Sequence, residues 1–312
     1  MTFLEQAFGI IYPPVLENEP LKKHSTIGIG GRAKYFAIPK SLYSLKLLVE
    51  GAKKARKRFV IIGNASNILF SDSGYNGIVI CTKNLSEIFV ASGKVKAMAG
   101  ASLNSLIDFA KKRGLSGLEK LYGIPATIGG AIYMNAGAFG QKIADCVYEV
   151  ETLKNGKLMK YSKEECRFGY RKSRFQKSKE VILSATFDFE KQEKDLIVAL
   201  VKNALETRKL LQPQGKSFGC VFTNPQNYNF SAGALIEGVG LKGFSFGGAT
   251  ISEKHANFII NNKNATAKEV VQLINLIKNK VNEKYGVLLN EEVKFIGDFN
   301  DSHGRLSHSH KI

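Results

Sequence analysis

The stretch Gly123-Ile124-Pro125-Ala126-Thr127-Ile128-Gly129-Gly130-Ala131 leads into Met134-Asn135-Ala136-Gly137-Ala138 and is the longest of three glycine-rich segments in this chain. Glycine and other small residues let backbone N–H groups come close to a ligand, and successive N–H groups form a nest that binds anions. Thr127 adds a hydroxyl donor without bulk. One such segment alone is usually a tight turn.

Because two further segments of this kind occur, a ligand-binding site is a better interpretation than a set of tight turns. They are 26–31 (Thr-Ile-Gly-Ile-Gly-Gly) and 63–69 (Gly-Asn-Ala-Ser-Asn-Ile-Leu), and the latter directly follows an apolar strand expected at 59–62. Two small-residue loops in one domain suit a dinucleotide pyrophosphate better than a single phosphate. Neither a Rossmann G-x-G-x-x-G fingerprint nor a P-loop is present, so we expect a different dinucleotide-binding fold.

Strand-like and helix-like segments alternate along the rest of the chain. Thr266 and Glu269 form a capping box before a helix whose apolar positions recur at helical spacing, and Gly286 ends it. Three prolines before residue 21 indicate an irregular N-terminal arm through residue 25. The pattern predicts a mixed α+β architecture with a boundary near 190–212. The other expected strands are at 78–82, 95–99, 147–153 and 181–189, and the other helices follow residue 41, begin after Ser102, or cover 195–209.

Charge and cysteine content narrow the possible partners and compartment. The 312 residues carry a net charge of +18, which favours anionic partners, but the basic residues are spread along the chain as on solvated helix faces. No basic signal-peptide region and no apolar run long enough to cross a bilayer is apparent, so we expect a cytoplasmic protein without a membrane partner. Four cysteines without a metal-type spacing suit a reducing compartment: Cys81, Cys146, Cys166 and Cys220.

A series of motifs beyond the glycine-rich segments carries a family resemblance. The motifs are Phe168-x-Tyr170-Arg171-x-Ser173-x-Phe175, Phe222-x-Asn224-Pro225, Ala232-Gly233-x-Leu235-Ile236, Gly240-Leu241-Lys242-Gly243, Lys254-His255-Ala256-Asn257-Phe258 and Leu289-x-x-Glu292-Val293. Together with the three glycine-rich segments, and in this order from about residue 20 to 297, they resemble the UDP-N-acetylenolpyruvoylglucosamine reductase family. Each motif alone is weak, whereas the ordered set is specific.

This resemblance implies a two-lobed FAD-binding domain of the vanillyl-alcohol-oxidase type, followed by a C-terminal α+β domain that binds a UDP-sugar. The implied limits are an N-terminal arm at 1–20, a first lobe at 21–80, a second lobe at 81–195, a substrate domain at 205–298 and a polar tail at 299–312. His303, His308 and His310 of the tail are interpreted as part of a frayed terminus rather than as metal ligands.

The resemblance also implies a reaction and its catalytic residues. NADPH reduces a non-covalently bound FAD, and the enolpyruvyl double bond of the UDP-sugar is then reduced in peptidoglycan precursor synthesis. The catalytic positions of the family fall on Arg171, Cys220 and Glu292. Arg171 is always charged, and its planar guanidinium can bind a carboxylate through two parallel hydrogen bonds. Glu292 can share a proton with the negative charge that develops on the substrate carboxylate during reduction. Cys220 takes the place of the proton donor.

Binding residues follow from the same motifs. Tyr170, Asn224 and His255 lie at positions implied to contact the substrate, although His255 serves equally well as a structural residue. No nucleic acid and no obligate protein partner is implied. The implied FAD-binding residues are Gly63, Asn64, Ala65, Ser66, Asn67, Ile68, Gly123, Ile124, Pro125, Thr127, Gly129, Gly130, Asn135, Ala136 and Gly137.

Several positions depart from the family pattern. Cys220 replaces the usual serine, and its thiol is expected to be a stronger acid whose thiolate fraction is open to alkylation and oxidation. Ala65 and Ala126 stand where glycine is typical, and Thr223 stands where lysine is common. Because no tyrosine occurs between residues 172 and 207, the chain resembles a shorter subgroup that lacks a tyrosine-bearing loop over the substrate.

Two other classes remain as alternatives. One is an oxidase of alcohols or sugars with the same FAD fold, in which a histidine such as His24 attaches the flavin covalently. The other is a basic nucleic-acid-binding protein, which explains the charge but not the glycine-rich segments.

Overall fold

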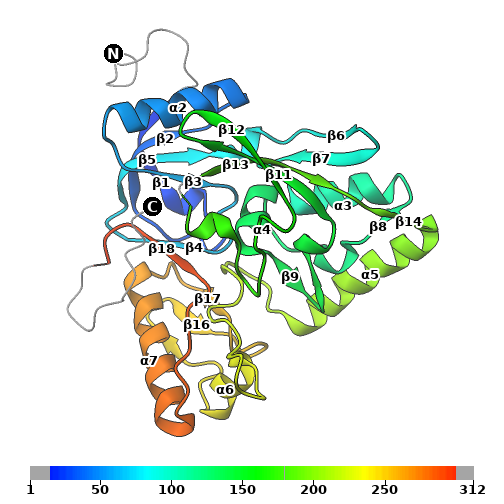
Figure 1. Ribbon diagram of the computed structural model, residues 1–312. Coiled ribbons are helices and arrows are strands. Elements are labelled where there is room, and N and C mark those ends of the chain that lie inside the picture. Colours follow the sequence, from blue (N-terminus) through cyan, green and yellow to red (C-terminus); the bar gives the residue numbers. More distant parts are fainter. Residues whose placement is uncertain (1–14, 179, 300–312) are drawn as a thin grey trace.

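The computed structural model describes residues 15–178 and 180–299, arranged in three parts (Figure 1). The first two parts are each built on one main sheet, and the third combines a small sheet with helices. This mixture of helices and separate sheets confirms the α+β class. Within the described residues, no helix combines the length and the apolar character that a bilayer span requires.

The first part is a four-stranded sheet in the order β1-β2-β5-β3, covered by helix α2. β1 and β2 are antiparallel, whereas β5 runs parallel to both β2 and β3. Leu45, Leu48 and Val49 supply most of the buried face of α2, and the side chain of Ser41 caps its first turn. The bounds are β1 Val15–Pro20, β2 Arg32–Ala37, α2 Leu42–Lys54, β3 Phe59–Ile62 and β5 Tyr75–Cys81.

The expectation of an irregular arm through residue 25 is wrong for residues 15–20, which form β1. This strand lies at the edge of the sheet with β2 as its partner. An edge strand needs ladder hydrogen bonds on one side alone, so it tolerates Pro20 at its end. Residues 1–14 lie outside the described part of the chain.

The second part is a five-stranded antiparallel sheet in the order β12-β11-β13-β7-β6, and helices pack against it in a shared hydrophobic core. Ser102 caps α3, as expected, and Thr127 caps the short helix α4. The bounds are β6 Ile88–Ala91, β7 Lys94–Met98, β11 Val147–Lys154, β12 Lys157–Ser162, β13 Val181–Phe187, α3 Leu103–Lys111, α4 Ile128–Met134 and α5 Lys194–Leu211, with the small pairs β8 Leu115–Ser116 and β14 Glu190–Lys191, and β9 Gly137–Ala138 and β10 Gln141–Lys142.

The third part packs helices α6 (Ala232–Gly238) and α7 (Ala267–Tyr285) with a three-stranded sheet. The capping box and the left-handed Gly286 cap are present as expected, and the apolar stripe of α7 is fully buried. The strands are β15 Ser245–Phe246, β16 Ala249–Ile251 and β17 Ile259–Asn261.

The third part is joined to the first by strand pairing and by hydrogen bonds between segments far apart in the sequence. The C-terminal strand β18 (Lys294–Ile296) pairs in parallel with β4 (Ile68–Phe70) beside the first sheet. Asp72, next to β4, accepts hydrogen bonds from the first two backbone N–H groups of α7, at 2.8 and 3.0 Å. These contacts fix where the residues before β18 lie relative to the cavity.

Candidate active site

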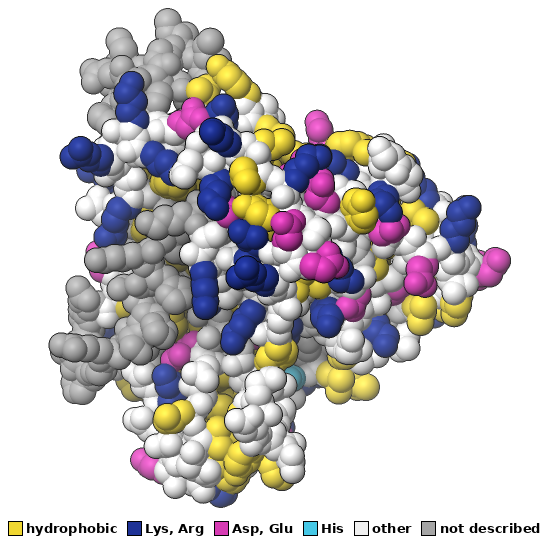
Figure 2. All heavy atoms as spheres, viewed as in Figure 1, with side chains coloured by type: hydrophobic (Ala, Val, Ile, Leu, Met, Phe, Trp, Pro, Cys, Tyr) yellow, Lys and Arg dark blue, Asp and Glu magenta, His cyan; other side chains and the backbone are white. Residues whose placement is uncertain are grey.

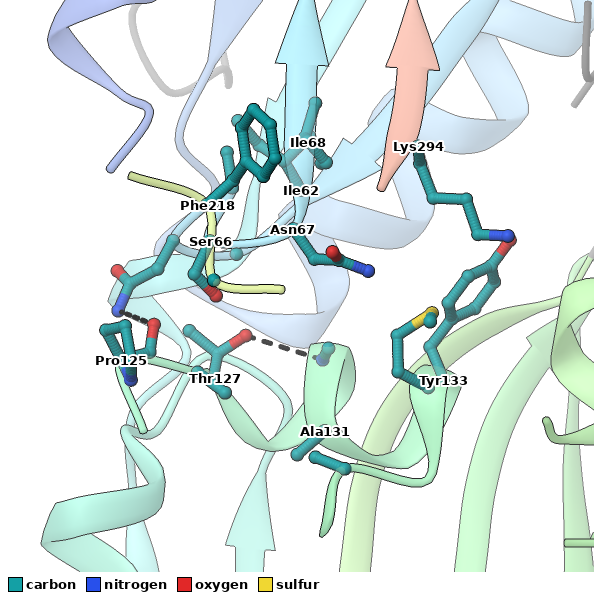
Figure 3. Close-up of a pocket in the computed structure, with 18 of the residues that line it drawn as sticks. Ile62, Ser66, Asn67, Ile68, Pro125, Thr127, Ala131, Tyr133, Phe218 and Lys294 are labelled. Carbon is teal, nitrogen blue, oxygen red and sulfur yellow. Dashed lines mark hydrogen bonds between the residues drawn. The ribbon is translucent and has the colours of Figure 1, made fainter. Parts of the chain in front are cut away.

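A cavity of about 1190 Å³ lies where the three parts meet. Its size exceeds the roughly 300–1,000 Å³ typical of small-molecule sites, which leaves room for a dinucleotide and a second ligand. Figure 3 shows Ser66, Asn67 and Thr127 pointing into it. Its wall is formed mainly by residues 59–68, 123–138 and 212–220, together with Arg171, Gln176, Glu292 and Lys294.

The loop after β3 presents backbone donors to the cavity. Within the described residues, the N–H groups of Asn64, Ala65, Ser66 and Asn67 have no backbone or side-chain acceptor. Ala65 has a φ of 47°, the left-handed conformation that lets successive N–H groups converge. This conformation explains why glycine is typical at that position. The free donors fit a ligand phosphate.

The loop after β3 and the 123–137 segment pack directly on one another. A Cβ atom at Gly63 would lie 2.0 Å from Thr127 Oγ1, so glycine is required there. The Asn64 side chain donates a hydrogen bond of 3.0 Å to the carbonyl of Pro125 (Figure 3). The two segments therefore form one wall of the cavity, although nothing in the sequence indicated that they contact each other.

The glycines of α4 have different surroundings. A Cβ at Gly129 would press against Ala99, at 3.1 Å from its Cβ, whereas a Cβ at Gly130 would meet only Thr127 Oγ1 at 3.5 Å. Gly130 is exposed and lines the cavity. It is therefore the position in α4 at which an added side chain fills ligand space without displacing protein atoms.

Asn135 does not line the cavity, unlike the other expected FAD-binding residues. It is 3% exposed, caps α4 with a φ of 45°, and donates a 2.9 Å hydrogen bond to the carbonyl of Gly169. We correct its assignment from a flavin contact to a residue that holds the segment before Arg171.

The N-terminal glycine-rich segment, residues 26–31, mostly packs against the third part and contributes little to the cavity wall. Of residues 26–31, Thr26 alone lines the cavity, and its hydroxyl donates to the Ser217 carbonyl at 2.6 Å. Ile27 and Ile29 are buried in the hydrophobic core of the third part. The expectation that this segment carries ligand chemistry is therefore largely replaced by a docking function.

The three expected catalytic residues come together on the cavity wall. Arg171 Nε lies 2.9 Å from Glu292 Oε1, and both side chains are mostly buried. The N–H of Nε is not aligned with a hydrogen-bond acceptor among the described residues, so the contact is an ion pair rather than a satisfied hydrogen bond. A guanidinium on the wall of a cavity is suited to a ligand carboxylate, and Arg171 lines this one.

The pKa values of Glu292 and Cys220 are both shifted upward. Burial raises the pKa of Glu292 above its usual range, although the nearby positive charge of Arg171 lowers it. Burial also raises the pKa of the Cys220 thiol to about 12, with a further contribution from the Glu292 charge and opposing contributions from Arg171 and Arg208. A raised pKa lowers the thiolate fraction on which the expected alkylation and oxidation of Cys220 depend.

The expected substrate residues lie beyond the cavity wall. The Tyr170 hydroxyl accepts a 3.2 Å hydrogen bond from the Asn224 backbone, and the Asn224 side chain accepts one from Ala232 at the start of α6. His255 packs against Phe258 with ring centroids 4.9 Å apart, and burial lowers its pKa. Tyr170 and Asn224 thus meet beside Arg171, while His255 has the surroundings of a structural residue.

Lys294, Tyr133 and Gln176 line the cavity but are absent from the sequence-based set. Figure 3 shows the Lys294 and Tyr133 side chains pointing toward one another. Lys294 follows Glu292 by two positions, at the start of β18, and both residues line the cavity. The closeness of Lys294 to the Glu292-Val293 motif is a signal the sequence contained; nothing in the sequence indicated Tyr133 or Gln176.

His24, the residue of the covalent-oxidase alternative, is not part of the cavity wall. Its ring stacks on Phe36 with centroids 4.1 Å apart, and Nε2 contacts Glu19 at 3.0 Å. Lys and Arg side chains are scattered among acidic ones over the face in Figure 2, in agreement with solvated faces. In the described ranges, no cluster of His, Cys, Asp and Glu side chains suited to a metal occurs, and the C-terminal histidines lie outside those ranges.

Comparison with known proteins identifies both domains. The family model "FAD binding domain" matches residues 33–162, and "UDP-N-acetylenolpyruvoylglucosamine reductase, C-terminal domain" matches residues 212–296. Curated relatives with that reductase name include one from Chlamydia felis, 43% identical over 88% of this chain and 92% of the relative. Another, from Carboxydothermus hydrogenoformans, is 42% identical over 92% of this chain and 96% of its own length.

A solved structure supports the same conclusion. The crystal structure of UDP-N-acetylenolpyruvylglucosamine reductase from Thermus caldophilus has a TM-score of 0.78 and 33% identity, covering 92% of this chain and 100% of that one. Fold and site thus define an oxidoreductase with an FAD-binding domain. The chain belongs to the UDP-N-acetylenolpyruvoylglucosamine reductase family.

Proposed function

We propose that this chain uses NADPH to reduce UDP-N-acetylenolpyruvoylglucosamine to UDP-N-acetylmuramate, in the cytoplasm and as a step of peptidoglycan precursor synthesis. The observation that supports this most directly is the meeting of Arg171, Glu292 and Cys220 on a cavity whose other wall is the 63–67 loop. The four free cysteines agree with a reducing compartment. The proposed limits of the second lobe and the substrate domain remain 81–195 and 205–298, whereas the first lobe, expected at 21–80, includes β1 and so begins at residue 15.

The residues present fit a non-covalent FAD. The unpaired N–H groups of residues 64–67 would hold its pyrophosphate, and the open space beside Gly130 would admit it along α4. Ser66 and Asn67 add side-chain donors at the same wall (Figure 3). When bound, FAD supplies hydride transfer between the nicotinamide and the substrate double bond.

Arg171 would bind the carboxylate of the enolpyruvyl group. Arg171 lines the cavity, and its charge would oppose the negative charge that builds on the carboxylate when hydride reaches the neighbouring double bond. Lys294 adds a second positive charge on the same wall. Tyr170 and Asn224, which contact one another beside Arg171, would hold the nucleotide-sugar portion.

Cys220 would supply the proton. Reduction of the double bond adds hydride to one carbon and a proton to the other, so a protonated group must lie at the second carbon. The raised pKa of the Cys220 thiol, about 12, keeps that proton available throughout the neutral range. Glu292, whose pKa is also raised, would return a proton to the thiolate or share one with the substrate carboxylate.

The test separates the two half-reactions under anaerobic conditions. NADPH should bleach the flavin absorbance of the purified protein, and subsequent addition of the enolpyruvyl UDP-sugar should restore it with formation of UDP-N-acetylmuramate. A flavin that NADPH reduces but the enolpyruvyl UDP-sugar leaves reduced would refute the proposed substrate.

A further inference from the structure

The Gln176 side chain connects Arg171 to the end of α4. We infer that Gln176 is a positioning residue for the proposed reaction, which fixes the backbone of Arg171 so that its guanidinium faces Glu292 and the substrate. Gln176 Nε2 donates to the carbonyl of Arg171 at 2.9 Å and to that of Tyr133 at 3.0 Å. This inference rests on the proposed function of Arg171.

Arg171 needs such support because of its backbone. Its φ is 53°, in the left-handed region that residues with a Cβ rarely adopt. Residues in this region persist only where their surroundings over-determine them, and they gather at functional sites. In an extended or right-handed conformation at this position, the side chain would leave the loop in another direction, away from its present ion pair.

The Gln176 side chain also contacts the C-terminal end of α4. Tyr133 and Met134 are the last residues of α4, where carbonyl groups lack helical partners. Gln176 Nε2 lies 3.5 Å from Met134 Sδ, and the Ser173 hydroxyl donates to the same Tyr133 carbonyl at 2.7 Å. The helix end therefore holds the loop at two points, of which Gln176 alone also reaches Arg171.

Gln176 acts through Arg171 rather than by contact with the catalytic pair. Within the described ranges, its side-chain hydrogen bonds go to Arg171, Tyr133 and Met134. On the preceding side, Asn135 Nδ2 holds the Gly169 carbonyl at 2.9 Å. The loop that carries Arg171 is thus fastened on both sides to the end of α4, and only the bond from Gln176 is made to Arg171 itself.

A double-mutant cycle tests this inference in the holoenzyme. Gln176→Met keeps the length of the side chain and removes both N–H donors, and Arg171→Ala removes the guanidinium. A shift of about 1 Å in a reacting group can cost about 10²-fold in rate. We therefore expect Gln176→Met to slow flavin reoxidation by the enolpyruvyl UDP-sugar about 10- to 100-fold, with flavin reduction by NADPH unchanged.

The decisive comparison is the Arg171→Ala background. There, adding Gln176→Met should slow reoxidation no further, because the group that Gln176 positions is gone. Ser173→Ala is the matched control: it removes a bond to the same Tyr133 carbonyl, and its effect should be the same in both backgrounds. Equal slowing by Gln176→Met in both backgrounds would overturn the inference. If Arg171→Ala alone leaves reoxidation unchanged, the proposed function itself fails.

Discussion

Arg171 Nε and Glu292 Oε1 are 2.9 Å apart, although Arg171 lies just after the segment matched as an FAD-binding domain, 33–162, and Glu292 lies in the C-terminal domain match, 212–296. The carbonyl of Glu292 accepts a 3.1 Å hydrogen bond from the Asn67 side chain, next to the strand pair β4 and β18. The loop that faces the flavin pyrophosphate in our proposal therefore also holds the backbone of Glu292, the proposed catalytic carboxylate. The Asn67 side chain thus links the proposed cofactor site to the proposed substrate site.

Arg171 and Glu292 should both act in the second half-reaction. Arg171→Ala or Glu292→Gln should leave flavin reduction by NADPH intact and slow reoxidation by the UDP-sugar by about 10²- to 10³-fold, the usual cost of losing one group that stabilises developing charge. Anaerobic stopped-flow measurement separates the two steps. Lys280→Ala is a suitable control, because it breaks an ion pair of the same 2.9 Å length at the surface. Equal loss in both half-reactions would contradict these roles.

The reoxidation rate should depend on pH through Glu292. Burial raises the pKa of this carboxyl, so the protonated form survives above the usual range and the rate should fall as pH rises through the shifted pKa. Arg171 lowers that pKa, so Arg171→Ala should move the fall to higher pH, and Glu292→Gln should remove it. A fall at the same pH in wild type and Glu292→Gln would assign it to another group.

Cys220 should be needed for proton transfer yet slow to react. Cys220→Ser should keep substantial turnover, whereas Cys220→Ala should reduce flavin normally and turn over slowly. An alanine variant with wild-type turnover would show that the proton comes from elsewhere, such as Glu292.

The raised pKa of the Cys220 thiol also sets its reactivity. With a pKa of about 12, its alkylation at pH 8 should be about 10²-fold slower than that of a small thiol, after allowing for the greater nucleophilicity of a basic thiolate. Mass spectrometry of the iodoacetamide-treated protein measures this directly. Alkylation of Cys220 at the rate of a free thiol would contradict the raised pKa.

Substitutions at Gly130 test whether α4 lies against the bound FAD. Since a Cβ there meets no atom closer than 3.5 Å, Gly130→Ala should keep or raise apoprotein stability, by up to about 1 kcal/mol from helix propensity. FAD affinity should fall progressively from Gly130→Ala to Gly130→Leu, measured by flavin fluorescence titration beside the thermal midpoint of the apoprotein. Unchanged affinity in Gly130→Leu would remove α4 from the cofactor site. Gly129 is less informative, because a side chain there presses against Ala99.

Asp72 should stabilise the docking of the domains. Its carboxylate accepts from the N–H groups of Ala267 and Lys268 at the start of α7, so Asp72→Ala should cost about 1 kcal/mol in the free energy of unfolding. Urea unfolding measures this loss. Thr266→Ala, which removes the local cap of the same helix, provides the comparison: it should destabilise α7 similarly but leave the substrate half-reaction less affected.

Local sequence patterns predicted much of the fold. The α7 helix appears with its capping box and Gly286 cap because both are encoded within a few residues. The β3 strand and α2 follow from their apolar spacing in the same way. The N-terminal strand β1 was missed, since its pairing with β2 depends on a partner and not on its own proline-containing sequence.

The sequence by itself determined the order of motifs, and with it the family, the two small-residue loops at the cavity and the identity of the three residues that meet there. Their meeting was decided only by tertiary structure, because the pairing of β18 with β4 carries Glu292 from the end of the chain to Arg171. The same packing removed Asn135 from the cavity wall and added Lys294 and Gln176 to it. It also set the pKa of Cys220, since burial beside Glu292 is a property of the assembled domains and not of any segment of the sequence.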